Sequence, residues 1–222
     1  QRQMCIRDRE SKIKVILNGV DGLTPVSTDE KRIIKERFNL PDGYKAVSIV
    51  ARLEDIKGHD YFIEAADRLL QKGIKARFYI AGTGSYENHL KEKVKNMNRQ
   101  EQIIFTGFIS DVDKLMSITD VQANASFGTE ATSLALLEGM SLGIPAVVSD
   151  FGGNPGVIKN GQNGYIVPKQ NSKALADNLE VLLTDQKLYD YMSQGAKKIF
   201  RKTFTAQAMT KQTEQVYLDL MK

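Results

Sequence analysis

Residues 46–81, AVSIVARLEDIKGHDYFIEAADRLLQKGIKARFYIA, contain the alternation of elements that decides the fold. Two apolar runs, Ala46 to Val50 and Ala76 to Ala81, have the length of buried strands. Between them, apolar residues recur along one stripe of a helix that closes near Gly73: Tyr61, Phe62, Ala65, Ala66, Leu69 and Leu70. Strand, helix and strand in this order predict a βαβ unit.

The rest of the chain continues the same alternation. Further strands are predicted at Lys14 to Leu17, Ile103 to Phe105, Val121 to Ala125, Ala146 to Val148 and Tyr165 to Val167. Further helices are predicted at Asp29 to Phe38, Tyr86 to Asn96, Val112 to Ile118, Ser133 to Leu142, Ser172 to Leu183, Leu188 to Phe200 and Ala206 to Met221. Because most strands are almost continuously apolar, we expect a doubly wound parallel sheet of the α/β class, Rossmann-like and covered on both faces.

Composition excludes several classes of protein. The 222 residues are 41% hydrophobic and 26% charged, which is close to the globular average and unlike collagen or a disordered chain. No apolar run approaches the roughly 20 residues that span a bilayer. A net charge of +4, spread among interspersed acids, is unlike a nucleic-acid interface. With one cysteine, Cys5, and two separated histidines, we expect no internal disulfide, no zinc site and a cytoplasmic location.

The N-terminal region suggests three segments. Residues 1–10 lack the apolar centre of a signal peptide, and we interpret them as a non-native leader. A turn-rich stretch, residues 18–25, favours an interdomain strand and linker helix over residues 11–43. Residues 44–222 then form the main domain. The alternative is a natural single domain with a short N-terminal strand.

The loop after the strand at residues 46–50 carries two cations, Arg52 and Lys57. Ligands of open α/β sheets bind beyond the carboxyl ends of the strands, and this pair is suited to gripping a diphosphate. Neither a dinucleotide glycine motif nor a P-loop follows the strand. The alternative is a solvated pair of cations partnered by Glu54 and Asp55. His59, which follows, is expected to be an exposed histidine that opens a helix.

Two later loops offer further contacts. Gly84 lies in a Gly-x-Gly turn that would let backbone approach a ligand closely. Phe108 and Ile109 could flank a flat base. The Asp111-x-Asp113 pattern resembles a metal motif, but Asp111 directly precedes a predicted helix, so we expect it to be an N-cap.

Glu130 and Glu138 stand eight positions apart around the start of a predicted helix. Thr132 or Ser133 can cap that helix, whose free N–H groups favour a phosphate. A carboxylate at Glu138, within an otherwise apolar segment, is costly without partners or water. One glutamate could therefore hold hydroxyls at each end of an extended anion. The alternative is an N-terminal acid favoured by the helix dipole and an exposed helical glutamate.

The order of these motifs resembles the retaining family-4 glycosyltransferases, whose fold is GT-B. The resemblance rests on Arg52-x4-Lys57-Gly58 and on Glu130-x7-Glu138 followed by residues 139–148, GMSLGIPAVV. It extends to residues 18–21, 105–108, 152–155 and 163–168, which read NGVD, FTGF, GGNP and NGYIVP. It covers Lys12 to about Lys222 and implies the C-terminal, donor-binding half of such an enzyme.

The resemblance implies a role for each site residue. Arg52 and Lys57 would hold the donor diphosphate and stabilise the leaving group, and Glu130 would bind the transferred sugar. Glu138 would bind the ribose, and Gly84 would leave room for the donor. The phosphates would meet backbone groups of Thr132, Ser133 and Leu134. The base would be lined by the apolar side chains of Phe108 and Ile109.

The resemblance also implies the reaction and its partners. A nucleotide-sugar would donate its sugar, with retention and without a metal or other cofactor, to a glycan or lipid-linked acceptor in polysaccharide or glycolipid synthesis. A missing N-terminal half would supply the acceptor site and any peripheral membrane contact, so this chain alone should transfer little. The alternatives are a non-catalytic nucleotide-binding module, or an epimerase or phosphorylase of the same fold.

Two departures from the family pattern stand near the site. Residues 131–133 read Ala-Thr-Ser where the family often has Gly-Phe-Gly, and residues 155–157 read Pro-Gly-Val where it often has Pro-Glu-Val. The first change adds hydroxyl groups beside the expected donor sugar.

Overall fold

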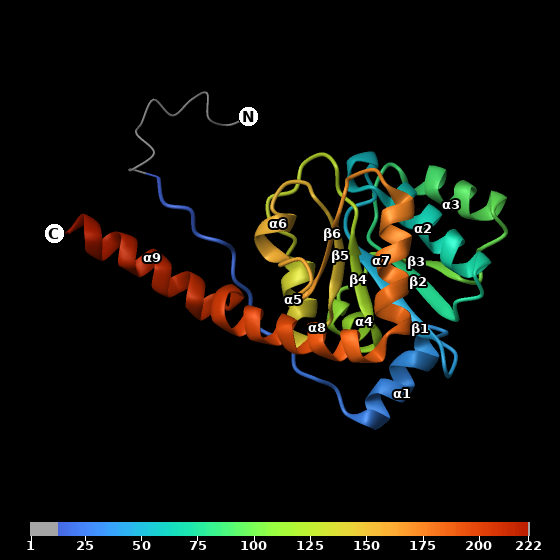
Figure 1. Cartoon of the computed structure of the whole chain (residues 1–222), viewed down its shortest axis with the longest axis horizontal. Coiled ribbons are helices and arrows are strands. Elements are labelled where there is room, and N and C mark those ends of the chain that lie inside the picture. The colour runs from blue at the N-terminus through green and yellow to red at the C-terminus, as the bar shows by residue number, and fades with distance from the viewer. Residues whose placement is uncertain (1–12, 222) are drawn as a thin grey trace.

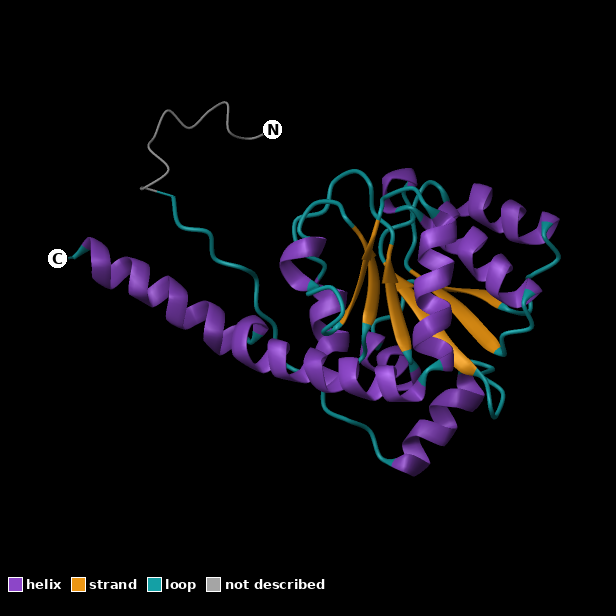
Figure 2. Cartoon of the chain, in the orientation of Figure 1, coloured by secondary structure: helices purple, strands orange, loops and turns teal. Residues whose placement is uncertain are grey.

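The computed structural model describes residues 13–221, so the proposed leader and Cys5 lie outside the described residues. Six parallel strands form one sheet with helices on both of its faces (Figures 1 and 2). The strands are β1 (Lys45–Val50), β2 (Ala76–Ala81), β3 (Ile103–Gly107), β4 (Val121–Asn124), β5 (Ala146–Ser149) and β6 (Gly164–Val167). The α/β class and the parallel sheet are confirmed.

The strand order is β3-β2-β1-β4-β5-β6, which is that of a doubly wound dinucleotide-binding sheet. The chain moves outward from β1 to β3 and then returns to pair β4 with β1, Val47 beside Val121. The direction of winding therefore reverses between β1 and β4. Loops that leave these two strands separate there, which makes this point the usual ligand crevice of such sheets.

Helices cover the sheet because side chains alternate along each strand. Val47 and Ile49 of β1 face a core shared with α2 and α7, whereas Ala46 faces one shared with α1 and α4. The helices are α1 (Thr28–Arg37), α2 (His59–Gln71), α3 (Glu87–Asn96), α4 (Val112–Ile118), α5 (Leu134–Leu142), α6 (Asn154–Val157), α7 (Ser172–Thr184), α8 (Gln186–Ile199) and α9 (Ala206–Leu220). A 3-10 turn, η3 (Asp55–Lys57), and a π-helical turn, η4 (Phe200–Phe204), complete the set.

The strand predicted at Lys14 to Leu17 is wrong. This stretch has no strand pairing, and a single parallel bridge follows it, from Val20 to Thr205. Apolar β-branched residues favour extended backbone, but a strand also needs a neighbour to complete its hydrogen bonds. Here the segment runs toward the start of α9, and Val20 forms its one β-bridge within the described chain (Figure 1).

Helix α1 packs on the sheet as well as following the linker. Ser27 and Glu30 are spaced as in a capping box, and the Ser27 hydroxyl caps the helix by accepting a hydrogen bond from the Glu30 N–H at 3.2 Å. The Glu30 carboxylate pairs with Lys114 of α4 at 2.6 Å instead of closing a capping box. Ile34 and Phe38 are buried in the core formed with α4. The division at residue 44 stays a prediction.

The C-terminal helices differ in burial. Phe200 and Phe204 of η4 are buried, whereas α9 has no buried residue. Tyr217 and Leu220 of α9 are 64% and 79% exposed. Helix α6 was not predicted, since its four residues include a proline and a glycine. Over residues 13–221, no helix combines the length and apolar character needed to cross a bilayer.

Candidate functional site

The candidate site lies at the point where the winding of the sheet reverses. Strand β1 runs into residues 51–58, which include η3, and the neighbouring strand β4 runs into residues 125–133. Both loops leave the carboxyl ends of their strands, so they face each other across the crevice that parallel sheets use for ligands. The topology thus brings Lys57 toward Glu130, 73 residues later in the chain.

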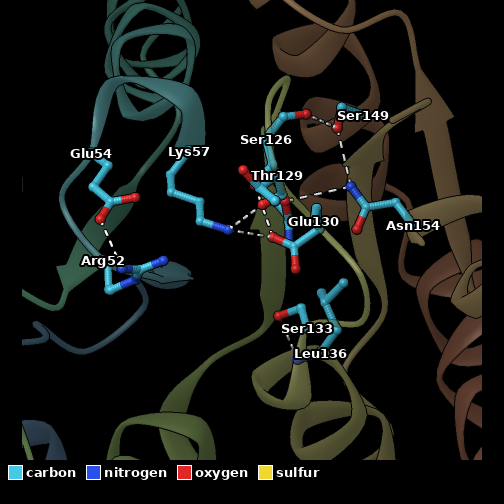
Figure 3. Close-up of polar contacts among 11 residues, drawn as sticks. Arg52, Glu54, Lys57, Ser126, Thr129, Glu130, Ser133, Leu136, Ser149 and Asn154 are labelled. Carbon is cyan, nitrogen blue, oxygen red and sulfur yellow. Dashed lines mark hydrogen bonds and ion pairs between the residues drawn. The ribbon is translucent and has the colours of Figure 1, made fainter. Parts of the chain in front are cut away.

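Lys57 and Glu130 form an ion pair across this crevice (Figure 3). The Lys57 Nζ lies 3.1 Å from Glu130 Oε2 and 2.8 Å from the Thr129 carbonyl oxygen. The two side chains are only 11% and 10% exposed. Screening by water is weak at such burial, so each charge stabilises the other. The solvated-charge alternative, in which Glu54 and Asp55 are the partners of the two cations, does not hold for Lys57, because its ammonium group pairs with Glu130 instead.

Arg52 occupies the open side of the same loop. Its guanidinium pairs with Glu54 at 2.9 Å, as the solvated-charge alternative predicts, and its side chain is 73% exposed. Arg52 also lines a pocket of about 250 Å³ with Thr83, Phe108 and Ile109. The structure therefore brings this arginine together with the two apolar residues expected to line a base. Phe108, 79% exposed, lies uncovered beside the pocket.

Gly84 is required by the packing of two loops. A Cβ atom there would lie 2.2 Å from the Leu53 carbonyl oxygen, which is a collision. The Leu53 N–H also donates to the Thr83 carbonyl oxygen at 2.9 Å, so the loops after β1 and β2 are joined at this point. Gly84 thus holds the Arg52 loop close to β2. Its expected role in leaving room for a donor stays a prediction.

The amino end of α5 opens toward Glu130. Ser133 is the N-cap, and its hydroxyl accepts from the Leu136 N–H at 3.4 Å, which resolves the choice between Thr132 and Ser133. Thr132 and Leu134 flank it, and Leu134 is 48% exposed. The first N–H groups of a helix lack partners within it, so this end presents donors and a positive dipole to the crevice.

Glu138 lies one turn inside α5 and is half-buried. Burial raises the pKa of its carboxyl group, and the nearby negative charge of Asp113 raises it further. Within residues 13–221, no hydrogen bond or ion pair satisfies this carboxylate. The alternative of an exposed helical glutamate is therefore only partly correct, because Glu138 is half-buried. Its carboxylate, without a partner in the described chain, can accept hydrogen bonds from a ligand.

Sequence reasoning missed the polar residues beneath Glu130. Asn124, Ser126, Ser149 and Asn154 are all buried, and they connect the ends of β4 and β5 to the glutamate (Figure 3). Asn154 belongs to the GGNP motif at residues 152–155, for which the family resemblance implied no role. The available signal was the presence of polar side chains where apolar strands end.

The structure corrects two expectations near the site, one wholly and one in part. His59 is 1% exposed, because it opens α2 on the core side, and neither ring nitrogen has a hydrogen-bond partner within the described chain. Burial lowers the pKa of His59 to about 4. Asp111 stands at the N-cap position of α4, as expected, but its side chain makes no capping hydrogen bond, because its carboxylate binds Arg37 instead. Among residues 13–221, no three His, Cys, Asp or Glu side chains are grouped so that they could hold a metal ion.

Comparison with known proteins gives the family. Residues 30–199 match the model of the glycosyl transferases group 1 family, which is more than half of the chain. The chain belongs to this family. It spans about half the length of the curated group 1 relatives it matches.

One curated relative and two solved structures illustrate the similarity. The Escherichia coli UDP-Gal:alpha-D-GlcNAc-diphosphoundecaprenol alpha-1,3-galactosyltransferase is 27% identical over 227 residues, covering 99% of this chain and 58% of its own. A solved C-terminal domain of a glycosyl transferase group 1 protein, LpcC from Francisella tularensis, is 26% identical with a TM-score of 0.75, covering 85% and 100%. Anabaena Alr3699/HepE, solved with UDP and glucose, has a TM-score of 0.85 at 21% identity, covering 94% and 57%, and shows the fold alone.

Proposed function

We propose that this chain binds a uridine diphosphate sugar and is the donor-binding half of a retaining glycosyltransferase. The family and the GT-B C-terminal fold support a nucleotide-sugar ligand. The choice of uridine is supported by the galactosyltransferase relative, named for UDP-Gal, and by the Anabaena protein solved with UDP and glucose.

The observation that carries the proposal is the buried Lys57–Glu130 pair at the reversal point of the sheet. Donor contacts surround it: the Arg52 pocket on one side and the amino end of α5 on the other. The base would lie against Phe108 and Ile109, and the diphosphate between Arg52, Lys57 and the α5 backbone at Thr132, Ser133 and Leu134. The Glu138 carboxylate would accept from the ribose hydroxyls.

The same groups account for transfer. When the bond between the sugar C1 and the phosphate oxygen breaks, its electrons stay on the leaving diphosphate, and Arg52 and Lys57 stabilise that charge. A preorganised donor to such an oxygen contributes roughly 2.7 to 4 kcal/mol. The acceptor hydroxyl forms the new bond to C1 on the same face and gives its proton to the leaving phosphate. Glu130 orients the sugar during this exchange.

The acceptor is proposed to be a glycan or a lipid-linked glycan. The galactosyltransferase relative acts on a diphosphoundecaprenol-linked sugar, which supports the lipid-linked class. An N-terminal half would carry this acceptor site and any contact with the membrane surface, so we expect this chain alone to bind donor and transfer little. Synthesis of a polysaccharide or glycolipid at the cytoplasmic face is the corresponding role.

Calorimetry with UDP, GDP and ADP tests donor binding. We expect UDP to bind, and Arg52→Ala and Glu138→Gln to weaken it at least tenfold. The matched controls are Lys173→Ala and Glu36→Gln, whose side chains are 72% and 66% exposed on helices away from the crevice. Unchanged affinity in Arg52→Ala and Glu138→Gln would overturn the proposed site and favour a non-catalytic module. Failure of all three nucleotides to bind would overturn the function itself.

A further inference from the structure

A buried network of amides and hydroxyls connects the loop after β5 to Glu130 (Figure 3). Asn154, the first residue of α6, is 1% exposed, and its Nδ2 donates to Ser149 Oγ at 3.0 Å and to Asn124 Oδ1 at 3.4 Å. The Ser149 hydroxyl in turn donates to the Ser126 carbonyl oxygen at 2.6 Å. Three loops thus meet beneath the glutamate.

The orientation of the two side-chain amides in this network follows from one backbone group. The Ser126 N–H can only donate, and it donates to Asn124 Oδ1 at 3.1 Å. The Asn124 Nδ2 is therefore turned toward Glu130 Oε2, 3.5 Å away. Asn154 must also approach Asn124 Oδ1 with its NH₂ group, because an oxygen would meet an oxygen there.

Three donors converge on one oxygen of Glu130. Lys57 at 3.1 Å, Ser126 Oγ at 3.0 Å and Asn124 at 3.5 Å all reach Oε2. Oε1 makes no hydrogen bond within the described chain, yet it is not a buried unpaired atom, so it stays accessible. Figure 3 shows this oxygen pointing away from the network. The network holds one oxygen and leaves the other for a ligand.

The loop that carries Asn154 also fixes the backbone of the glutamate. The Gly153 N–H donates to the Glu130 carbonyl oxygen at 3.0 Å. A Cβ at Gly153 would lie 1.5 Å from the Ala131 carbonyl oxygen, and Gly152 has a φ of +61°, a conformation that favours glycine. The 152–154 loop therefore determines both the main-chain position and the side-chain orientation of Glu130.

We propose that Asn154 is a positioning residue that aims Glu130 Oε1 at the hydroxyls of the donor sugar. This inference rests on the proposed function. The Asn154 Oδ1 is buried without a hydrogen-bond partner, which costs stability. The presence of an amide here is therefore explained by its Nδ2 group, which donates to Ser149 and Asn124. Leucine at this position keeps the volume and removes both donors, and aspartate would present oxygens to two acceptors.

The test compares dissociation constants for UDP and for a UDP-sugar, measured by calorimetry on the whole chain. UDP-glucose, UDP-galactose and UDP-N-acetylglucosamine are titrated first, and the one that binds most tightly is used. We expect Asn154→Leu and Asn154→Asp to weaken the UDP-sugar at least tenfold and to leave UDP within about twofold. Glu130→Gln should weaken the UDP-sugar at least as much, because it acts on the sugar contact itself; it also removes the ion pair of Lys57, so its UDP affinity is not a criterion for the role of Asn154.

Asn163→Leu is the matched control. Asn163 is also a fully buried amide, and it bonds to the Lys159 N–H and the Val157 carbonyl oxygen without reaching Glu130. It should lower the unfolding temperature but keep the ratio of the two dissociation constants. If Asn154→Leu does not fold, Asn154→Ser, which keeps one donor, is measured in its place and should show a smaller selective loss.

The outcomes separate this inference from the proposed function. A parent chain that binds neither UDP nor any UDP-sugar contradicts the proposed function. A parent that binds both, with folded Asn154 variants that lose affinity for the two equally or not at all, overturns the positioning role alone.

Discussion

At the level of single residues, His59 makes stability depend on pH. Burial lowers the pKa of this imidazole from 6.5 to about 4, so the folded protein disfavours the protonated form. Well above pH 6.5 the ring is neutral in both the folded and the unfolded protein, so it does not change the free energy of unfolding. As pH falls from 6.5 toward 4, the unfolded chain takes up the proton first, and the free energy of unfolding should drop by up to about 3 kcal/mol. Denaturant unfolding of the parent and of His59→Gln across this range measures the difference.

The control for this prediction is His89→Gln. The His89 side chain is 53% exposed, stacks on Tyr86 and lies 3.3 Å from Asp60 Oδ1, so it stands outside the buried position of His59. Its variant should follow the parent curve between pH 4 and 6.5, whereas His59→Gln should be flatter. Parallel curves for the parent and His59→Gln would show that the buried ring does not cause the acid sensitivity.

At the level of elements, α5 connects stability to ligand binding through its cap. Ser133→Ala removes the hydroxyl that accepts from the Leu136 N–H, and Ser27→Ala removes the equivalent bond at α1. Each should cost about 1 kcal/mol of unfolding free energy, since both leave a first-turn N–H without its partner. Only Ser133→Ala should also weaken UDP binding, because only α5 begins at the crevice. Chemical denaturation and calorimetry on both variants test this; equal UDP affinity would contradict the role of the α5 terminus.

At the level of the whole molecule, the core ends at η4. Phe204 is 1% exposed, and its carbonyl oxygen accepts from the Val20 N–H at 3.0 Å, whereas α9 has no buried residue (Figure 1). Ending the chain after Thr210 keeps the contact from Gly19 to Met209 and should change the melting temperature by less than about 4 °C. Phe204→Ala leaves a cavity and should cost about 3 to 5 kcal/mol. Thermal unfolding followed by circular dichroism measures both, and a large loss on truncation would place α9 within the cooperative core.

Much of the fold follows from patterns within a few residues. The strand runs at 46–50 and 76–81 and the helical stripe between them appear in the structure as β1, β2 and α2. Hydrophobic periodicity predicts such elements because each buries one face or stripe. The stretch at Lys14 to Leu17 shows the limit of this reasoning: its residues suit a strand, but only the tertiary structure determines whether a neighbouring strand exists.

The candidate site was predictable in its residue types and loops, but not in its pairings. The sequence placed Arg52, Lys57 and Glu130 in loops that follow strands. It could not show that Lys57 pairs with Glu130 and not with Glu54 or Asp55, or that Asn154 supports that glutamate through Ser149 and Asn124. The Asn154–Asn124 and Lys57–Glu130 contacts join residues 30 and 73 positions apart, so they depend on the strand order.

The sequence by itself determined the class of fold and the order of strands β1 to β6 with most of the helices between them, because propensity and periodicity act between residues close in the chain. Only the tertiary structure decided that His59 is buried, that Asp111 binds Arg37, and that one oxygen of Glu130 is held while the other has no partner among residues 13–221. Burial and long-range pairing depend on which surfaces the sheet brings together, and that arrangement exists only once β4 has paired with β1.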